Sequence, residues 1–484
     1  MTGAPAIAVE GLTVTAGDTR LLAPISFELP EGATLVVMGE TGAGKSLMAQ
    51  AILGALPRGL TASGTVWLGG ERIDTLPERA RATLWGRKVA MLPQEPWRAL
   101  DPLMAAAPQV AETHRLVAGR GGREAARATA ADFATLGLTG AERRLPGALS
   151  GGMAQRVAFA AATAGGAPIL IADEPTKGLD ADRRDAVIAL LAGVATEGGS
   201  LLAITHDVTV ARRLGGEAML LKDGALVEAG PVGDLLATPR SAYARAFVAA
   251  APEAWPRPPA AAIGAPVLEA EGVAVDRGGR RLVEEFDLAL GAGEKIAISG
   301  QSGSGKTSLL DVLAGLLPPA AGTVRRAPGV GRTGVQKLYQ DPPAAFPPSV
   351  TLGRALDDVR RLHGVERGVL SDLLRRLKIA PAILERRPDG VSGGELQRIA
   401  LARVLSIAPS VVLADEPTSR LDPITQAEVM ALIAATVVET GTAIVLVTHD
   451  DAVASRWADR AIALPAPRPN PARPNAARTQ PNAA

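Results

Sequence analysis

The sequence predicts an α/β protein made of two tandem domains, each with a mostly parallel sheet flanked by helices. Apolar runs such as TLVVMG (34–39) and KIAISG (295–300) contain few polar residues, which is typical of strands buried on both faces of a parallel sheet. Each run leads into a glycine-rich loop and then a stretch with helical periodicity. The same ordered set of motifs occurs once in each half, so we infer that a whole domain is duplicated.

The expected domain boundaries follow from composition. A chain of 484 residues is too long for one ordinary hydrophobic core. We expect the first domain at residues 1–250 and the second at residues 267–464. Residues 251–266 are rich in Pro and Ala and predict a semi-extended linker. Residues 465–484 have almost nothing to bury and predict a disordered tail.

Composition also excludes several classes of protein. The sequence contains no cysteine, so disulfides, Cys-ligated zinc and iron–sulfur clusters are ruled out. The 51 basic and 50 acidic residues leave a net charge of +1, without the basic excess of a broad nucleic-acid surface. We therefore expect no nucleic-acid partner. The sequence shows neither a signal-peptide pattern nor an apolar run of about 18 residues, so we expect a cytosolic location.

Each half contains a loop of the form G-x-x-x-x-G-K-[ST] between a predicted strand and a predicted helix. Backbone N–H groups of such a loop surround phosphate oxygens, and glycine leaves room for this approach. The lysine adds a charge near the β and γ phosphates, the next hydroxyl can ligate Mg²⁺, and the helix N-terminus favours anions. The loops comprise Gly39, Glu40, Thr41, Gly42, Ala43, Gly44, Lys45 and Ser46, and Gly300, Gln301, Ser302, Gly303, Ser304, Gly305, Lys306 and Thr307.

Four further motifs follow each loop in the same order. They are a glutamine after an apolar run, a Ser-Gly-Gly motif that opens a helical stretch, an Asp-Glu pair at a strand end, and a histidine after the next strand. The spacing from the serine motif onward is nearly the same in both halves. These residues are Gln94, Ser150, Gly151, Gly152, Asp173, Glu174 and His206, and then Gln340, Ser392, Gly393, Gly394, Asp415, Glu416 and His449.

With these motifs in this order twice, the chain resembles the ATP-binding cassette (ABC) ATPases from residue 6 to about residue 463. The paired LSGGMAQR (149–156) and VSGGELQR (391–398) are the most specific element, because a phosphate loop alone occurs in many unrelated NTPases. The resemblance implies two P-loop NTPase domains, each with an antiparallel β subdomain and a helical subdomain beside the parallel core. It also implies that ATP is hydrolysed to ADP and phosphate with Mg²⁺.

The resemblance assigns a role to each motif. Glu174 and Glu416 accept a proton from the attacking water, a role that typically contributes about 10²–10⁴ in rate. His206 and His449 contact the γ-phosphate. The metal is held by Ser46, Gln94 and Asp173 in the first half and by Thr307, Gln340 and Asp415 in the second.

The Ser-Gly-Gly motifs act across the two halves in this family. The resemblance implies that Ser392, Gly393 and Gly394 complete the site that contains Lys45. It likewise implies that Ser150, Gly151 and Gly152 complete the site that contains Lys306. We therefore expect two competent composite sites, formed by intramolecular pairing of the two domains.

One feature departs from the family pattern. Family members usually stack an aromatic residue on adenine from a strand before the phosphate loop. The corresponding stretches here are LTVTAGDTR (12–20) and VAVDRGGRR (273–281), and neither contains an aromatic residue. Without this aromatic residue, either arginine or aliphatic side chains can hold the base. The sequence therefore leaves GTP as an alternative substrate to ATP.

Two kinds of segment point to one branch of the family. PQEPWRALDPLM (93–104) and YQDPPAAFPPSVTL (339–352) are similar to the Q-D-P-x-x-S-L-N-P segment of peptide- and nickel-type importer ATPases. TPRSAYARAFVAAAPEAWP (238–256) is similar to the H-P-Y-T-x-x-L-L-x-x-x-P ending of that branch. This likeness implies import of a dipeptide, oligopeptide or nickel-type solute. It also implies two transmembrane permease subunits, an external solute-binding protein and a peripheral position on the cytoplasmic face of the inner membrane.

Three other branches were weighed against the importer. A ribosome-acting ABC protein would usually have a long charged helical linker, and a zinc-bearing DNA-repair ABC ATPase would have cysteine clusters. This sequence has neither feature. A soluble accessory ATPase of a phosphonate-breakdown enzyme complex remains an alternative. The transported cargo is not encoded in this chain.

Overall fold

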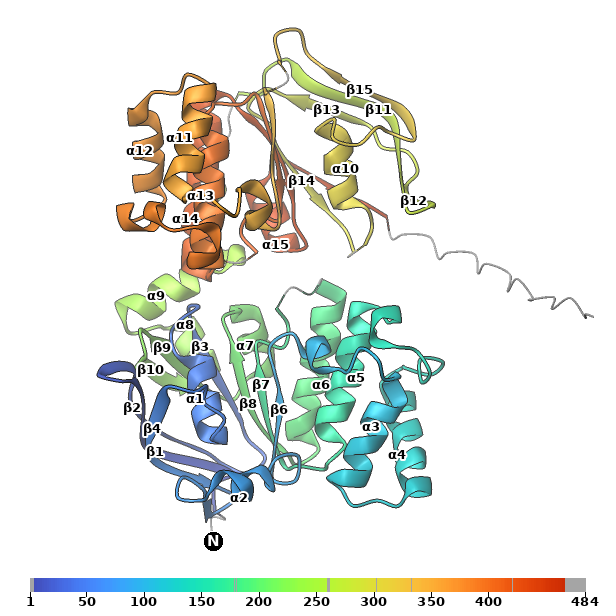
Figure 1. Ribbon diagram of the computed structural model, residues 1–484, viewed down its shortest axis with the longest axis vertical. Coiled ribbons are helices and arrows are strands. Elements are labelled where there is room, and N and C mark those ends of the chain that lie inside the picture. Colours follow the sequence, from blue (N-terminus) through green and yellow to red (C-terminus); the bar gives the residue numbers. More distant parts are fainter. Residues whose placement is uncertain are drawn as a thin grey trace, which may run out of the picture. The chain divides into compact units, whose positions relative to one another are not determined.

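The computed structural model describes residues 4–177, 179, 181–258, 262–301, 303–331, 333–419 and 421–465, except the side chains of Trp97, Ala181 and Asp182. The chain divides into two compact units (Figure 1): the first comprises the described residues up to Trp255 together with Leu421–Ala427, and the second comprises the other described residues. The expected tail beyond Pro465, residues 259–261 of the expected linker, and Ser302 lie outside the described residues.

The first unit is built on a six-stranded sheet with the strand order β10-β9-β3-β8-β7-β6. All its neighbours pair in parallel except β10, which is antiparallel to β9. In this order the strands are β10 (Ala225–Pro231), β9 (Glu217–Lys222), β3 (Thr34–Gly39), β8 (Ser200–Thr205), β7 (Ile169–Asp173) and β6 (Val89–Leu92). Strand β3 ends in the phosphate loop, and strand β7 ends in the Asp-Glu pair.

Strand β3 is buried on both faces, as its apolar sequence predicts. Val37 packs in a core with Met48 of helix α1 (Lys45–Leu53). Val36 and Met38 face the other way and pack against α7 (Val208–Leu214), α8 (Val232–Ala237) and α9 (Ala242–Ala249). The phosphate loop therefore leaves a strand that is held from both sides.

An antiparallel sheet and a helical layer complete the first unit. The sheet has the order β2-β1-β4-β5, and its apolar residues join the core under α1. In the helical layer, Phe133 is fully buried against residues of the helix that follows the first Ser-Gly-Gly motif. The elements are β1 (Ile7–Ala16), β2 (Thr19–Leu29), β4 (Leu60–Leu68), β5 (Glu71–Arg72), α2 (Glu78–Ala82), α3 (Ala106–Leu116), α4 (Gly122–Thr135), α5 (Gly151–Thr163) and α6 (Ala181–Thr196).

The second unit repeats this arrangement with a five-stranded sheet of order β16-β17-β18-β14-β19. Every neighbouring pair in this sheet is parallel. A separate antiparallel sheet has the order β12-β11-β13, and β15 also pairs with β11. The strands are β11 (Pro266–Arg277), β12 (Arg280–Val283), β13 (Leu288–Gly291), β14 (Lys295–Ser299), β15 (Ala321–Arg326), β16 (Val335–Leu338), β17 (Val411–Asp415), β18 (Ala443–Val447) and β19 (Arg460–Ala463).

The helices of the second half follow the same order as those of the first. Helix α10 follows the phosphate loop, and its Leu309 and Leu313 are fully buried against β14 and β11. Helix α13 follows the second Ser-Gly-Gly motif. The helices are α10 (Lys306–Leu313), α11 (Leu352–Leu362), α12 (Arg367–Arg376), α13 (Gly393–Leu405), α14 (Pro423–Thr440) and α15 (Asp451–Trp457).

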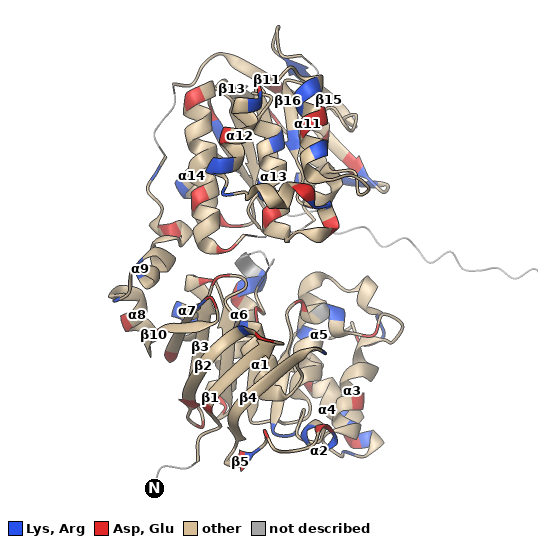
Figure 2. Ribbon diagram, turned by 60° about the vertical axis from the view of Figure 1, so that its left-hand side comes forward, with Lys and Arg blue, Asp and Glu red and all other residues tan. Residues whose placement is uncertain are grey.

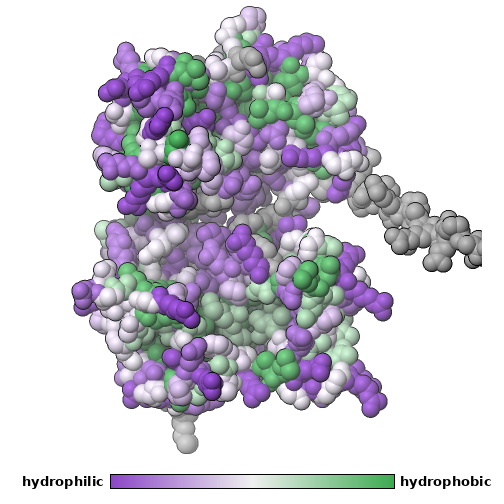
Figure 3. Space-filling model, viewed as in Figure 1, coloured by the Kyte–Doolittle hydropathy of each residue, from purple (hydrophilic) through white to green (hydrophobic). Residues whose placement is uncertain are grey.

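These observations confirm the predicted fold class, including the antiparallel and helical parts. Strand β2 begins at Thr19, and helix α1 ends at Leu53, where Gly54 forms the C-cap with a φ of 67°. No helix among the described residues is long and apolar enough to cross a membrane. Basic and acidic residues are interspersed over the ribbon (Figure 2), and the face in Figure 3 mixes hydrophilic and hydrophobic residues.

Candidate active site

The first phosphate loop joins β3 to α1 and depends on glycine at its entrance. Gly39 has a φ of 146°, and a Cβ at this position would lie 2.3 Å from the carbonyl oxygen of Leu221. Gly42 and Gly44 have φ values of 88° and 91°, which side-chain-bearing residues rarely adopt. The loop geometry therefore excludes larger residues at three positions of the motif.

Lys45 lies inside this loop and is only 6% exposed. Its Nζ donates to the carbonyl oxygens of Gly39 at 2.7 Å and Glu40 at 2.8 Å. Burial lowers the pKa of Lys45, and the nearby charge of Glu174 offsets part of this effect. The ammonium group is thus held at the centre of the loop.

The second phosphate loop, between β14 and α10, has the same construction. Gly300, Gly303 and Gly305 have φ values of 145°, 83° and 97°. Lys306 Nζ donates to the carbonyl oxygens of Gly300 at 2.5 Å and Gln301 at 2.9 Å. Both halves therefore place a buried lysine against the first two carbonyls of the loop.

Each loop hydroxyl meets the aspartate at the end of a neighbouring strand. Ser46 Oγ donates to Asp173 Oδ1 at 3.0 Å, and Thr307 hydrogen-bonds the Asp415 side chain. Burial raises the pKa of both aspartates, although these hydroxyl contacts lower it again in part. The structure therefore brings each predicted loop hydroxyl next to its strand-end carboxylate.

This donor set fits a Mg²⁺ ion that arrives with a nucleotide. Among the described residues, no group of three or more His, Cys, Asp or Glu could hold a metal ion. Protein-bound Mg²⁺ usually keeps several waters and is held through one or two carboxylates together with substrate phosphates. One hydroxyl and one carboxylate beside a phosphate loop meet that requirement.

Glu174 follows Asp173 and adopts a strained backbone conformation. Its φ is 47°, and its N–H donates to the carbonyl oxygen of Ile204 at 2.9 Å. This conformation is energetically unfavourable for a residue that has a Cβ, and it occurs preferentially at functional sites. The strain directs the Glu174 carboxylate away from the strand and towards Lys45, 3.7 Å from its Nζ.

His206 contacts the other carboxylate oxygen of Glu174. Its Nδ1 lies 2.6 Å from Glu174 Oε2. Burial alone would raise the pKa of Glu174, but the charges of His206 and Lys45 outweigh it, and the pKa lies below its ordinary value. The carboxylate is therefore held ionised.

Glu416 in the second unit has the same backbone and a fuller set of contacts. Its φ is 47°, and its carboxylate contacts His449 Nδ1 at 3.1 Å and accepts from Gln340 Nε2 at 3.1 Å. Burial would raise the pKa of Glu416, but His449 and Lys306 outweigh it and lower the pKa. Burial lowers the pKa of His449, and the contact with Glu416 more than restores it.

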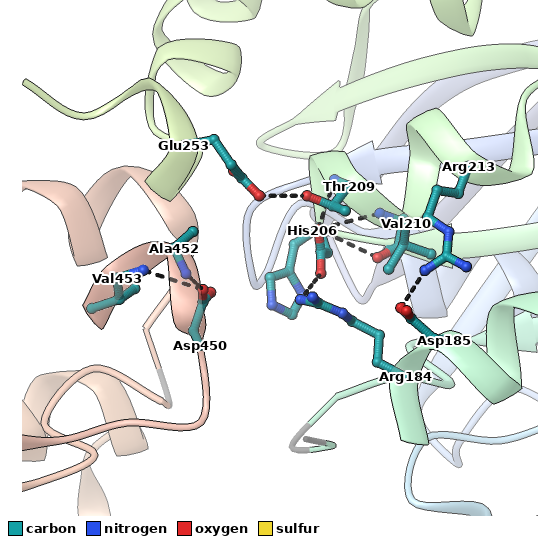
Figure 4. A network of polar contacts seen from close by, with 12 residues as sticks. Arg184, Asp185, His206, Thr209, Val210, Arg213, Glu253, Asp450, Ala452 and Val453 are labelled. Carbon is teal, nitrogen blue, oxygen red and sulfur yellow. Dashed lines mark hydrogen bonds and ion pairs between the residues drawn. The ribbon is translucent and has the colours of Figure 1, made fainter. Parts of the chain in front are cut away.

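The aspartate after each histidine explains why Thr-His-Asp occurs twice. Asp207 Oδ1 accepts from the N–H groups of Thr209 and Val210 at 2.7 and 3.3 Å, and so caps α7. Asp450 caps α15 in the same way, through the N–H groups of Ala452 and Val453 (Figure 4). Each histidine is therefore fixed between a buried strand end and a capped helix.

Gln94 is placed differently from Gln340. Its side chain is exposed, and among the described residues it makes no hydrogen bond with Glu174. The residue after Gln94, Glu95, adopts a φ of 55°, whereas the residue after Gln340, Asp341, has a φ of −100°. The sequence prediction treated the two glutamines alike, and the structure brings only Gln340 to its glutamate.

The Ser-Gly-Gly motifs form helix N-termini. Ser150 caps α5, with its Oγ accepting from Met153 N at 3.3 Å. Ser392 caps α13 in a full capping box, in which the Glu395 carboxylate accepts from the Ser392 amide at 2.8 Å and hydroxyl at 2.7 Å. Gly151, Gly152, Gly393 and Gly394 form the first turns of these two helices.

Two contacts near the first site were not predicted from the sequence. Gln155 of α5 is 1% exposed and donates through Nε2 to the carbonyl oxygen of Pro175, the residue after Glu174. Tyr243 of α9 contacts Glu40 of the phosphate loop. Both contacts join residues separated in the sequence, and Tyr243 lies within the segment 238–256 that resembles the ending of importer ATPases.

The fold and the paired motifs define a P-loop ATPase with two nucleotide-binding domains. The chain belongs to the ABC transporter family, whose characteristic sequence pattern matches residues 22–177 and 283–419. It is an ABC-type ATPase. The predicted family and the predicted enzyme class are thereby confirmed.

Curated relatives match nearly the whole chain. The peptidoglycan transport ATP-binding protein YejF of Agrobacterium fabrum is 32% identical, over 91% of this chain and 86% of that protein. The glutathione import ATP-binding protein GsiA of Escherichia coli K12 is 30% identical, over 94% of this chain and 84% of that protein.

Solved structures share the fold. The RNase-L Inhibitor structure has a TM-score of 0.63 at 21% identity, and the match covers 90% of this chain and 83% of that one. The archaeal ribosome recycling factor aABCE1, solved with the ribosomal stalk protein aP1, also gives 0.63 at 22% identity, with the same coverage. At these identities the likeness shows the fold alone.

Proposed function

We propose that this chain is the ATP-hydrolysing subunit of an ABC importer for a small solute of the dipeptide, oligopeptide or nickel class. The observation that carries the proposal is the duplicated constellation of phosphate-loop lysine, strand-end carboxylates and histidine, in a chain similar over nine-tenths of its length to proteins named for peptidoglycan transport and glutathione import. Peptidoglycan and glutathione, the solutes in those two names, are compatible with the proposed dipeptide or oligopeptide class.

In the proposed mechanism, Glu174 and Glu416 act as general bases. Each carboxylate is held ionised, so it can accept a proton from the water that attacks the γ-phosphate. His206 and His449 orient these carboxylates through the Nδ1 contacts, and the other ring nitrogen, Nε2, is the proposed contact with the γ-phosphate. Phosphoryl transfer depends mainly on such positioning and charge stabilisation.

Ser46 and Asp173, and Thr307 and Asp415, are the proposed magnesium ligands, joined by Gln94 and Gln340. The bound ion neutralises charge on the β and γ phosphates. The hydroxyl–aspartate hydrogen bonds bring each pair close enough to act on one ion. Lys45 and Lys306 supply the second positive charge at each phosphate chain.

The two sites are proposed to be composite and crossed. Ser392, Gly393 and Gly394 complete the site of Lys45, and Ser150, Gly151 and Gly152 complete the site of Lys306. A helix N-terminus offers free backbone N–H groups to an anion, and both motifs form such N-termini. ATP then closes one domain on the other, and the tether within one chain favours this intramolecular pairing.

The second half offers an arginine to the nucleobase. In the second unit Arg277 projects from the β11–β12 hairpin, and its Nη1 lies 3.3 Å from Ser308 Oγ on the helix after the phosphate loop. We propose that this guanidinium contacts the base in place of the missing aromatic residue, since arginine stacks on planar rings. Figure 1 shows the hairpin beside α10.

The proposed partners are two transmembrane permease subunits and an external solute-binding protein, with this chain peripheral on the cytoplasmic face of the inner membrane. The absence of a membrane-spanning helix from the described residues is compatible with this position. The test is cross-linking and affinity isolation of the full chain from cells, with ATP present. Recovery of two multi-span membrane proteins supports the importer. Recovery of a soluble lyase assembly instead supports the phosphonate-breakdown alternative and overturns the importer.

A further inference from the structure

A tyrosine from outside the recognised ATPase motifs reaches the first phosphate loop. Tyr243 lies on α9, about two hundred residues further along the chain, and its hydroxyl oxygen accepts from the backbone N–H of Glu40 at 3.4 Å. The same hydroxyl also hydrogen-bonds the Glu40 side chain, whose carboxylate can only accept. One phenol group therefore holds both the main chain and the side chain of the second loop residue.

Tyr243 is itself held in place. The ammonium group of Lys222 lies 5.0 Å from the centre of its ring, a distance typical of a cation–π contact. The ring also lies 6.1 Å from that of Phe247, which is fully buried. Ser241 caps α9 by accepting from Ala244 N at 3.0 Å. The helix therefore presents the hydroxyl from a fixed position.

Glu40 links Tyr243 to Lys45 through hydrogen bonds. The carbonyl oxygen of Glu40 is one of the two oxygens that accept from Lys45 Nζ. The Tyr243 hydroxyl, the Glu40 residue and the Lys45 ammonium thus form one connected set of hydrogen bonds. A shift of Glu40 would displace an acceptor of Lys45 and alter the entrance of the loop.

Burial raises the pKa of both side chains in this set. It raises the pKa of Tyr243 far above its ordinary value, so the phenol stays protonated and remains a donor. Burial also raises the pKa of Glu40, and the Tyr243 hydrogen bond lowers it again in part. The directions of these two pKa shifts agree with the contact between Tyr243 and Glu40 that the geometry shows.

The second half does not use a tyrosine in this way. The chain contains two tyrosines, and the other, Tyr339, follows β16 and lies under the ammonium group of Lys337, 5.2 Å from its ring centre. The Tyr243 contact is therefore specific to the first site.

We propose that Tyr243 is a positioning residue of the first nucleotide site, which sets nucleotide affinity there and couples helix α9 to the phosphate loop. This inference rests on the proposed site at Lys45. It predicts that loss of the hydroxyl weakens binding at the first site and leaves the second site unchanged.

The test measures nucleotide affinity one site at a time in the full chain. A fluorescent N-methylanthraniloyl ATP is titrated with Mg²⁺ into a Lys306→Ala protein, in which the first site remains, and into a Lys45→Ala protein, in which the second site remains. Tyr243→Phe is expected to weaken binding about three- to tenfold in the first background, as for a lost hydrogen bond, and to have no effect in the second. Equal effects in both backgrounds, or none in either, overturn the inference.

Two controls separate positioning from general destabilisation. Arg245→Ala changes an exposed side chain of α9 that donates to the Arg240 carbonyl oxygen, and it is expected to leave the affinity unchanged; an effect equal to that of Tyr243→Phe overturns the inference. Hydrogen exchange of the peptide that contains Glu40 is expected to quicken in Tyr243→Phe only. If Lys45→Ala leaves both binding sites intact, the proposed first site itself is wrong, and the inference fails with it.

Discussion

The Nδ1 atom of His206 lies 2.6 Å from Oε2 of Glu174, which joins the ends of two neighbouring parallel strands through one contact. Strand β8 leads to the histidine and strand β7 leads to the glutamate. Because both strands are buried and in register, neither side chain can move far without disturbing the sheet. The equivalent contact in the second unit joins His449 to Glu416 at 3.1 Å.

The two glutamates are expected to be essential for turnover and dispensable for binding. Glu174→Gln combined with Glu416→Gln keeps the shape of each side chain but removes the proton acceptor. We expect steady-state ATP hydrolysis to fall about 10²–10⁴-fold, with ATP retained. Phosphate release and filter binding measure the two effects. Glu71→Gln, an exposed glutamate paired with Lys88, is the matched control, and near-normal hydrolysis in the double variant would show that the assigned bases are wrong.

The magnesium requirement should depend on the loop hydroxyls. Ser46→Ala with Thr307→Ala removes one proposed ligand from each ion, so we expect half-maximal hydrolysis to require more Mg²⁺. Removal of Mg²⁺ with EDTA should stop hydrolysis in the unchanged protein and leave it folded. Thr13→Val, which removes a hydroxyl that bonds Ser63 on the antiparallel sheet, is the control. The same Mg²⁺ dependence in all three proteins would contradict the assignment.

The entrance glycine of the first loop should be irreplaceable. In Gly39→Ala, the added Cβ would meet the Leu221 carbonyl oxygen at 2.3 Å and would also be held at a φ of 146°. Gly42→Ala provides the comparison, because it has a φ of 88° but open space around it. Strain of this kind costs about 1–3 kcal/mol, and the clash adds to it at Gly39 only. Urea unfolding should therefore show a larger loss for Gly39→Ala; equal losses would indicate that the clash is relieved without cost.

The capping box of α13 should give a pH-dependent contribution to stability. Hydrogen bonds from the Ser392 hydroxyl and amide lower the pKa of Glu395 below its ordinary value of 4.5. A depressed carboxyl pKa stabilises the folded state above the unfolded value, and this stabilisation is lost as pH falls through the folded value. Glu395→Gln should therefore lower the unfolding free energy at about pH 7 and have progressively less effect below about pH 4.5. Urea unfolding at several pH values measures this, and a constant difference would contradict it.

Much of the fold could be predicted because its signals are local. The run TLVVMG gave the bounds of β3 to the residue, since a doubly buried strand contains almost only apolar residues. The hairpin of β1 and β2 was harder to delimit, because the pairing contains several register shifts that disturb the alternation of apolar and polar residues.

The site motifs were predictable from their order, but several contacts were not. The difference between Gln94 and Gln340 accompanies a different backbone conformation at the next residue, Glu95 or Asp341, which the motif pattern does not specify. Trp255 shows the same limit: it lies in the Pro/Ala-rich stretch expected to be linker, yet it is 7% exposed, and its Nε1 donates to the carbonyl oxygen of Ala250. Such contacts depend on packing between distant segments.

The most direct test of the proposed crossed sites compares Ser392→Arg with Ser150→Arg. Each protein is incubated with a photoreactive azido-ATP, Mg²⁺ and vanadate, irradiated, and cleaved between the two units to show which half is labelled. If the sites are crossed, Ser392→Arg should reduce labelling of the half that contains Lys45 more than that of the half that contains Lys306, and Ser150→Arg should do the opposite. The reverse pattern, in which each substitution affects the phosphate loop of its own half, would contradict the account.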